Sequence, residues 1–291
     1  MHTSRTSNWR PLLRAFFAFL IGIVAFWAIL GNARAQLFVT TSQGHNGVVS
    51  EYNATTGAAI NPNFITGLAD PSALALSGNK LFVANDVSPG FVGKYDAITG
   101  AVINANFITG TGLRGPNALA LSGNKLFVLD PSLEVGKYDA TTGAVIKANL
   151  ITGLFSPGPT ALALSGNVLF VANFNGSVGK YDATTGAAIN GSFIVGGNPF
   201  GLALSGNKLF VAEGFLGTVA KYDAITGAVI NANFITGLAG SNALALSGNK
   251  LFVLDRLGTV GKYDATTGAV INANFITGLT QPFGLVVKGA K

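Results

Sequence analysis

The sequence predicts an all-β fold: a six-bladed β-propeller with four antiparallel strands in each blade. The tripeptide Leu-Phe-Val returns six times, beginning at residues 37, 81, 126, 169, 209 and 251. Each repeat of about 42 residues contains four short apolar segments separated by turn residues, and none shows a sustained 3.6-residue period. The copies fill residues 36–291 without a linker, so we expect a single propeller domain there.

The second copy shows the first two strands of a repeat. Residues 73–76 (Ala-Leu-Ala-Leu) are a short apolar run, which we name strand A. A tight turn follows at residues 77–80, where we expect Gly78 and Asn79 to supply the positive φ of a two-residue hairpin. Residues 81–84 are continuously apolar, which indicates a strand B that is covered on both faces.

The other half of the same copy provides two more strands. Residues 91–96 form strand C, and the turn from Asp96 to Gly100 combines a side chain that bonds its own backbone with a residue that tolerates positive φ. Strand D, residues 101–109, alternates apolar residues with Asn104 and Asn106. That period of two predicts a half-exposed strand at the outer edge of the blade.

The two ends of the repeat region complement each other. The first copy starts at strand B (residues 36–39) and lacks a strand A, whereas the last copy ends in a strand A (residues 283–287). We therefore expect the C-terminal strand to complete the N-terminal blade. A ring closed in this way leaves no long open sheet edge.

Two phrases connect the chain with a known repeat. Pro-Phe-Gly-Leu at residues 199–202 and 282–285, followed in the first case by Leu-Phe-Val-Ala at residues 209–212, resembles the NHL-type repeat of secreted bacterial propellers. The resemblance implies a propeller and no particular activity. The chain departs from that pattern at the end of strand B. The NHL-type repeat usually has Asp there, whereas the six copies of this chain end in Thr, Asn, Asp, Asn, Glu and Asp. The phrase Tyr-Asp-Ala-Thr-Thr-Gly is also similar to surface-layer and quinoprotein-like repeats, whose propellers commonly have seven or eight blades.

Residues 1–35 have the pattern of a secretory signal peptide. Three arginines precede an apolar run over residues 15–30, and Ala33-Arg34-Ala35 follows it. We predict cleavage after Ala35 and a secreted, periplasmic or cell-surface protein. The competing interpretation is that the segment stays uncleaved as a membrane anchor, which would be the only membrane contact we expect. Against an anchor, the apolar run is shorter than the roughly 20 residues that span a bilayer.

Composition narrows the function classes. Residues 36–291 hold 14 basic and 12 acidic side chains, so the charge gives no support to nucleic-acid binding. The chain has no Cys, which excludes disulfides and thiol chemistry, and a single His in this region leaves little room for a His-based catalytic set. We expect a monomer that is stabilised by burial alone.

Residues that recur in every copy should serve packing. Each strand C contains one Tyr, each strand B one Phe, and five of the six D strands one Phe. These rings are expected to form the core between neighbouring blades. The Lys that precedes the Tyr and the Asp that follows it are expected to be solvated edge and turn residues.

The variable connections form the candidate functional face. The A–B and C–D turns hardly change between copies, whereas the B–C and D–A connections on the opposite face do. We expect that face to bind a protein or glycan partner, unless its apolar residues instead cover the channel mouth as a small satellite core. The candidate residues are Phe91, Leu113, Arg114, Phe155, Phe174, Phe200, Phe215, Arg256, Leu257 and Phe283.

The ends of the B strands provide a candidate metal site. Their carboxylates and amides are hard oxygen donors, suited to calcium or magnesium in the central channel, as in some six-bladed lactonase-like enzymes. The alternative is that each side chain bonds its own loop. His45 is the candidate general base. The candidate ligands are Asn85, Asp130, Asn173, Glu213 and Asp255.

Three functions remain open. The first is an exported binding or scaffold module that uses the variable face, the second is a metal-dependent lactonase-like hydrolase or lyase, and the third is a structural envelope or matrix protein. Catalysis requires different groups in different blades, and these copies are nearly alike. The sequence therefore favours binding over an enzyme.

Overall fold

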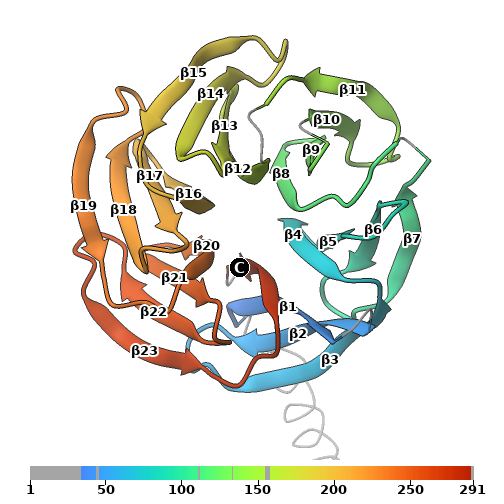
Figure 1. Ribbon diagram of the computed structural model, residues 1–291. Helices are drawn as coiled ribbons and strands as arrows, with labels where there is room; N and C mark the ends of the chain where they lie inside the picture. Colours follow the sequence, from blue (N-terminus) through green and yellow to red (C-terminus); the bar gives the residue numbers. More distant parts are fainter. Residues whose placement is uncertain (1–33, 44–45, 111, 133, 155–157, 290–291) are drawn as a thin grey trace, which may run out of the picture. The chain divides into compact units, whose positions relative to one another are not determined.

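A computed structural model describes residues 34–43, 46–110, 112–132, 134–154 and 158–289, and residues Ala35–Gly289 form one compact unit. The described residues form six four-stranded antiparallel sheets, which are arranged like blades around a central axis (Figure 1). They contain no helix, and hence none that could cross a bilayer. The predicted propeller is confirmed, whereas the signal-peptide prediction falls almost entirely on residues outside this description.

Each blade runs from an innermost to an outermost strand. Blade 1 comprises β24 (Pro282–Lys288), β1 (Gln36–Gln43), β2 (Asn46–Asn53) and β3 (Ala59–Leu68). Blade 2 comprises β4 (Pro71–Ser77), β5 (Lys80–Asn85), β6 (Phe91–Asp96) and β7 (Val102–Ile108), and blade 3 comprises β8 (Ala118–Ser122), β9 (Lys125–Asp130), β10 (Glu134–Asp139) and β11 (Val145–Ile151).

The second half of the ring repeats this order. Blade 4 comprises β12 (Pro159–Ser165), β13 (Val168–Asn173), β14 (Ser177–Asp182) and β15 (Ala188–Val195). Blade 5 comprises β16 (Pro199–Ser205), β17 (Lys208–Glu213), β18 (Thr218–Asp223) and β19 (Val229–Ile235), and blade 6 comprises β20 (Ser241–Ser247), β21 (Lys250–Asp255), β22 (Val260–Asp264) and β23 (Val270–Ile276).

The C-terminal strand closes the ring as predicted. β24 pairs antiparallel with β1, which places Leu37 opposite Val287 and Val39 opposite Leu285. Leu37, Val39 and Leu285 also pack in one buried cluster with Phe252 and Phe275 of blade 6. The same strand therefore completes blade 1 and supports its contact with blade 6.

The hydrophobic core lies between neighbouring blades. Six buried clusters each combine side chains from two adjacent blades; Phe82 of blade 2, for example, shares a cluster with Tyr138 of blade 3. The predicted Tyr and Phe residues are buried, apart from Tyr52 and Phe193, which are partly buried. The packing prediction is confirmed.

The A–B turn needs glycine at only one position. Gly78 has a φ of 57°, but Asn79 is not among the positive-φ residues, so the expectation for Asn79 is wrong. A positive φ at the first central residue alone is typical of a type II′ hairpin. The carbonyl of Asn79 instead accepts the N–H of Ala97 at 2.9 Å, which ties this turn to the C–D turn of the same blade.

The outer strands are more exposed than their alternation predicts. In β7 the residues Val102–Asn106 are all exposed, and only Phe107 and Ile108 are buried. Phe107 and Ile108 belong to the cluster that joins blades 2 and 3, so only the end of β7 contacts the next blade. The half-exposed pattern predicted for strand D is therefore wrong over most of its length.

The lysines of strand C are contacts between blades, not solvated edge residues. Lys94 is 8% exposed, and its Nζ donates to the carbonyls of Ala140 (2.9 Å) and Thr141 (3.1 Å) in the next blade. The same ammonium lies 4.4 Å from the ring centroid of Phe107. Lys137, Lys180, Lys221 and Lys262 repeat the hydrogen bond to the next blade. The following Asp residues are turn residues, as predicted.

Blade 1 makes the equivalent contact with different residues. Glu51 occupies the place of the lysine, is 4% exposed and accepts a hydrogen bond from Gln36. Lys288 from β24 supplies the ammonium and donates to the carbonyl of Ala97 in blade 2 at 3.1 Å. Burial raises the pKa of the Glu51 carboxyl, and the Gln36 hydrogen bond and nearby Lys288 oppose that rise. Lys288 of the closing strand thus makes the contact that a strand C lysine makes in the other five blades.

Candidate functional site at the channel mouth

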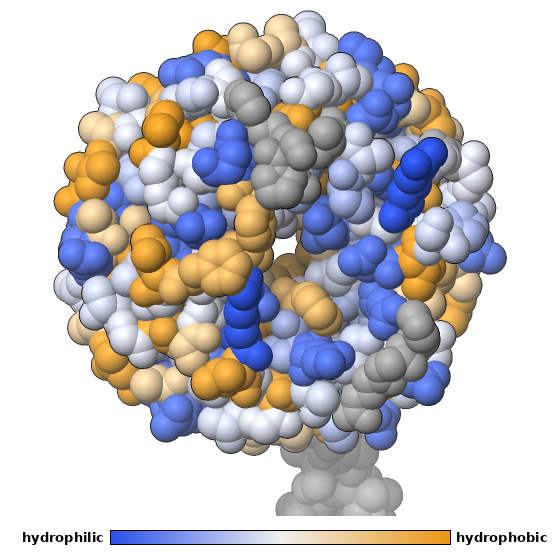
Figure 2. Space-filling model, in the orientation of Figure 1, coloured by the Kyte–Doolittle hydropathy of each residue, from blue (hydrophilic) through white to orange (hydrophobic). Residues whose placement is uncertain are grey.

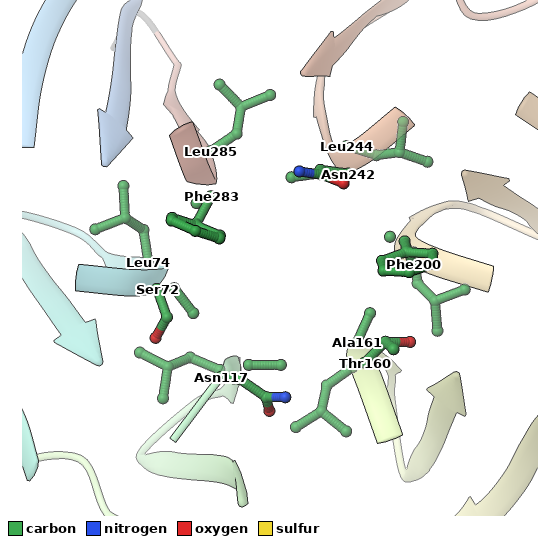
Figure 3. Close-up of a pocket in the computed structure, with 18 residues that line it drawn as sticks. Ser72, Leu74, Asn117, Thr160, Ala161, Phe200, Asn242, Leu244, Phe283 and Leu285 are labelled. Atoms are coloured by element: carbon green, nitrogen blue, oxygen red, sulfur yellow. The ribbon is translucent and has the colours of Figure 1, made fainter. Parts of the chain in front are cut away.

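Successive residues at the start of each innermost strand line the central channel, and the first of them lies at its mouth. Figure 3 shows these side chains around a common opening. Each residue at the mouth is the second residue of the phrase that begins strand A, just after Pro71, Pro116, Pro159, Pro199, Ser241 and Pro282. The channel-facing residues at the mouth are Ser72, Asn117, Thr160, Phe200, Asn242 and Phe283.

Three of these residues tie one inner strand to the next. Ser72 Oγ donates to the carbonyl of Pro116 at 2.6 Å, and Thr160 Oγ1 donates to the carbonyl of Pro199 at 2.7 Å. Asn117 Nδ2 donates to the carbonyl of Pro159 at 3.2 Å. The Oδ1 atom of Asn117 is buried and has no hydrogen-bond partner among the described residues. Blades 2 to 4 therefore give the mouth a polar side with one unused acceptor.

The mouth encloses a cavity of about 590 Å³. In addition to the six channel-facing residues, Asp86, Arg256, Gln281 and Pro282 line it. Figure 2 looks onto the ring and shows a central opening that both hydrophobic and hydrophilic side chains border. The volume lies in the range of about 300–1,000 Å³ typical of sites for small ligands or single side chains.

An aromatic cluster with one arginine lies beside this cavity. The rings of Phe174, Phe200 and Phe215 meet edge to face, with centroids 5.3, 5.5 and 5.9 Å apart. Arg256 Cζ lies 4.4 Å from the Phe200 centroid and 4.6 Å from the Phe215 centroid, and its Nε donates to Asn242 Oδ1 at 2.9 Å. We name these four residues the Phe–Arg cluster.

The predicted partner-binding residues do not all meet at this site. The structure brings together Phe174, Phe200, Phe215 and Arg256, and it places Phe283 in the adjoining cavity. Leu257 is 77% exposed next to Arg256. Phe91 is half-buried and Leu113 is a core residue, so Leu113 is not available to a partner.

The remaining candidates are Arg114, Phe155 and His45. Arg114 is exposed but does not line the cavity, and its backbone N–H donates to Asp130 Oδ2 at 2.6 Å. Phe155 and His45 lie outside the described residues. Phe174, Phe200 and Phe215 pack together, as a satellite core would, and Phe215 remains 60% exposed, so partner binding by these loops stays a prediction.

The five candidate metal ligands bond their own loops. Asp130 accepts from the backbone N–H groups of Arg114 and Ser132, and Asp255 accepts from those of Leu257 and Thr259. Glu213 accepts from the N–H of Asn198, Asn85 accepts from that of Ala69, and Asn173 bonds Val171 and Ser177.

This arrangement does not fit a metal centre. The five side chains lie at the ends of second strands, not innermost ones, and none lines the mouth cavity. Within the described parts of the chain, no three His, Cys, Asp or Glu residues come close enough to hold an ion. Burial raises the pKa of Glu213, against the effect of its backbone hydrogen bond. Asp130, Asn173 and Asp255 bond the loop that follows them, as the alternative predicts, whereas Asn85 and Glu213 bond the D–A connection that precedes the same blade.

Several mouth residues were missed because the repeat hides them. Ser72, Asn117, Thr160 and Asn242 occupy the position of the strand A phrase that varies most between copies. A second variable position follows each strand B and is filled by Ser42, Asp86, Pro131, Phe174, Gly214 and Arg256. Comparing the copies position by position, rather than loop by loop, would have identified both sets.

Fold and site together define a closed propeller of nearly identical blades with one asymmetric mouth. The family model described as outer membrane protein assembly factor BamB matches residues 31–233, more than half of the chain. The chain therefore belongs to the BamB family. That membership does not specifically support the NHL-type assignment, which stays an interpretation. No curated protein matches the sequence.

Solved structures share the architecture at low sequence identity. A chain in the crystal structure of a nidogen/laminin complex superposes with a TM-score of 0.71 at 14% identity, over 87% of this chain and 98% of that one. The computationally designed Ika8 protein gives a TM-score of 0.52 at 18% identity, over 86% of this chain and 78% of that one. At these identities the likeness concerns the fold alone.

Proposed function

We propose that the protein is an exported scaffold module that binds a protein partner through the Phe–Arg cluster and the exposed side chains beside it. The observation that carries this proposal is the gathering of aromatic side chains and one arginine at the mouth, with Phe215 60%, Leu216 62%, Leu257 77% and Phe283 48% exposed. Aromatic residues and arginine dominate the binding energy of protein interfaces.

The comparisons add two supporting points. The family description concerns outer membrane protein assembly, in which proteins act on other proteins, and the nidogen/laminin propeller was crystallised in a complex. The pattern of residues 1–35 supports export and cleavage after Ala35. N-terminal sequencing of the protein recovered from the cell envelope tests that step: we expect Gln36 as the first residue, and an intact leader would favour an anchored form.

A metal-dependent lactonase-like enzyme and a purely structural envelope protein are the alternatives. The candidate ligands bond their own loops, so no arrangement of the described residues favours the enzyme. If the protein is purely structural, the mouth should bind no specific partner. If the partner is a glycan, the co-purification described below should recover a glycan and no protein.

The test is co-purification of the full chain and its Phe215→Asp variant from the envelope of the producing cells. A charge in the middle of the aromatic cluster should reduce the recovered partner protein at least about tenfold, because truncating an interface anchor often costs 2 kcal/mol or more. The variant loses the ring contacts with Phe174 and Phe200, but its melting temperature should fall by only a few degrees, since Phe215 is mostly exposed.

Ile225→Asp is the matched control. Ile225 is 61% exposed, like Phe215, but lies in a C–D turn on the opposite face of the ring. We expect this variant to keep the partner. Equal recovery with Phe215→Asp and the unaltered chain would refute the proposed surface. Recovery of a glycan without any protein would show that the partner is a glycan and not a protein.

A further inference from the structure

We propose that the mouth cavity binds an organic carboxylate with an attached apolar group, and that Arg256 holds the carboxylate. This inference goes beyond the proposed function because it requires no protein partner. The carboxylate can belong to a free organic acid or to the C-terminus of a polypeptide, since both present the same chemistry to the cavity. It rests on how Arg256 is held, what it lacks and what surrounds it.

The guanidinium of Arg256 is fixed before any ligand arrives. Its Nε donates to Asn242 Oδ1 at 2.9 Å, and its Cζ lies within 4.6 Å of the ring centroids of Phe200 and Phe215. The backbone N–H of Arg256 donates to the carbonyl of Gly240 at 2.9 Å. A side chain at position 240 would crowd Arg256, because a Cβ there would lie 3.3 Å from Arg256 Cδ. A guanidinium held in this way loses little further freedom when it binds.

The same guanidinium has no carboxylate partner in the described residues. The ion pairs found there join Lys80 with Asp96, Lys208 with Asp223 and Lys250 with Asp264, all in the A–B and C–D turns. The only side-chain hydrogen bond of Arg256 there uses Nε and leaves both Nη groups free for a ligand. Two adjacent N–H donors of one guanidinium match the two oxygens of a carboxylate.

The rest of the cavity specifies what is attached to the carboxylate. Phe200 packs against Arg256, and Phe283 and Pro282 add apolar surface to the same cavity, where Phe283 is 48% exposed. Elsewhere in the cavity, Ser72, Asn117 and Thr160 supply polar side chains. The volume of about 590 Å³ accommodates a ligand with an aromatic ring and one amide.

Asp86 limits the charge of the ligand. It lines the same cavity, and burial raises the pKa of its carboxyl, helped by the nearby carboxylates of Asp70 and Asp130. An ionised Asp86 repels a second negative charge, so we expect monoanions to bind more tightly than dianions. Replacing Asp86 with Asn should strengthen the binding of an anion.

The differences between copies support a ligand at this place. The chain keeps its turns and core residues nearly constant, yet the second position of strand A changes around the mouth, and the position after strand B contributes Asp86 from one blade and Arg256 from another. Packing alone would be served by the same residue in each blade, as the repeated Tyr and Phe residues show. An asymmetric set around a symmetric ring is what an asymmetric ligand requires.

Calorimetric titration of the full chain tests the proposal with N-acetyl-phenylalanine and its uncharged counterpart, N-acetyl-phenylalaninamide. We expect the acid to bind at least about tenfold more tightly than the amide, and Arg256→Gln to remove that preference. Asp86→Asn should increase the affinity for the acid, and such a gain cannot result from misfolding. A pair of peptides that end in Phe, one with a free carboxylate and one amidated, separates the two sources of the carboxylate.

Lys208→Gln is the control for net charge, because it removes one positive charge from an exposed turn on the opposite face. It should bind the acid like the unaltered chain. Binding of the free acid supports a small-molecule source, and binding of the acidic peptide alone supports a protein C-terminus. Equal affinity for acid and amide, no binding of either acid at millimolar concentration, or an unchanged Arg256→Gln variant would overturn the proposal, and none of these results would affect the Phe215 experiment.

Discussion

At the scale of single residues, Lys94 and its four counterparts hold neighbouring blades together. Each ammonium is removed from most of the solvent, donates to backbone carbonyls of the next blade and lies over phenylalanine rings. Desolvation lowers the pKa of Lys94, and the nearby Lys80 adds to that effect. Hydrogen bonds and cation–π contacts compensate for the burial of charge.

Replacing Lys94 with Met should therefore destabilise the protein by about 2 kcal/mol, because a side chain of similar length leaves two carbonyls without their donor. Lys80→Met is the control: Lys80 is exposed and has only a 3.8 Å pair with Asp96, so its loss should change stability by no more than about 0.5 kcal/mol. Urea unfolding measures both. Equal effects would show that the buried contact adds no stability.

The turn aspartates should govern acid stability. Backbone N–H groups of residues two and three positions on donate to Asp96, Asp139, Asp182, Asp223 and Asp264, and these bonds hold the carboxyl pKa values below their usual range. A lowered folded-state pKa gives stability that is present above about pH 4 and lost as the pH falls through the folded-state value. The raised pKa values of Glu51, Glu213 and Asp86 have the opposite sign and favour the folded state on acidification.

The matched variant replaces all five aspartates with Asn. Blade 1 shows that Asn suits this turn, since Asn53 Oδ1 accepts from the N–H groups of Thr55 and Thr56 at 2.8 and 3.0 Å. Urea midpoints between pH 6 and pH 2 should fall less for the fivefold variant than for the unaltered chain. If the urea midpoints of both proteins fell equally with pH, groups other than these aspartates would cause the acid unfolding.

Sequence reasoning succeeded for residues whose role is local or repeated and failed where the role depends on another blade. The turn aspartates bond their own turn, and the repeated Tyr and Phe could be placed in the core from recurrence alone. Lys94 looks solvated because it precedes a tyrosine in an ordinary strand, but its carbonyl partner is 46 residues away. The polar mouth residues Ser72, Asn117, Thr160 and Asn242 were missed for the same reason, because separate blades bring them together.

At the scale of elements, the outer strand of each blade has no neighbouring strand on one side, and two kinds of side chain hinder pairing at this open edge. In five blades an Asn Oδ1 accepts the N–H of the residue two positions on, as Asn104 does for Asn106 at 3.0 Å. In blade 3 the corresponding residue is Lys147. Both devices discourage pairing between exposed edges of different molecules.

Replacing Asn104, Asn231 and Asn272 with Val should expose three uncapped apolar edges, because the neighbouring Val102 and Ile103 are already 63% and 45% exposed. We expect light scattering to detect aggregates at concentrations where the unaltered chain is monodisperse. Lys at the same three positions imitates blade 3 and should remain monodisperse. Monodisperse Val variants would show that the asparagines do not protect these edges.

At the scale of the whole molecule, a stable ring of similar blades carries one asymmetric site. Duplicated packing residues account for closure, including β24 and the substitution of Lys288 for the missing lysine of blade 1. The fold could be predicted because every copy repeats the same signals. The site could be predicted only in part: the variable loops pointed to Phe174, Phe200, Phe215 and Arg256, but not to the polar residues that meet them when the ring closes.

The central claim is that the mouth face carries the function. The most direct measurement introduces a photo-activated cross-linker at position 215, 257 or 283, and in parallel at position 98 or 225 on the opposite face, in full chains within the intact envelope. The account predicts one discrete cross-linked protein from the mouth positions and none from Ile98 or Ile225, although those residues are 57% and 61% exposed. Cross-links of equal yield from both faces, or only from positions 98 and 225, would contradict it.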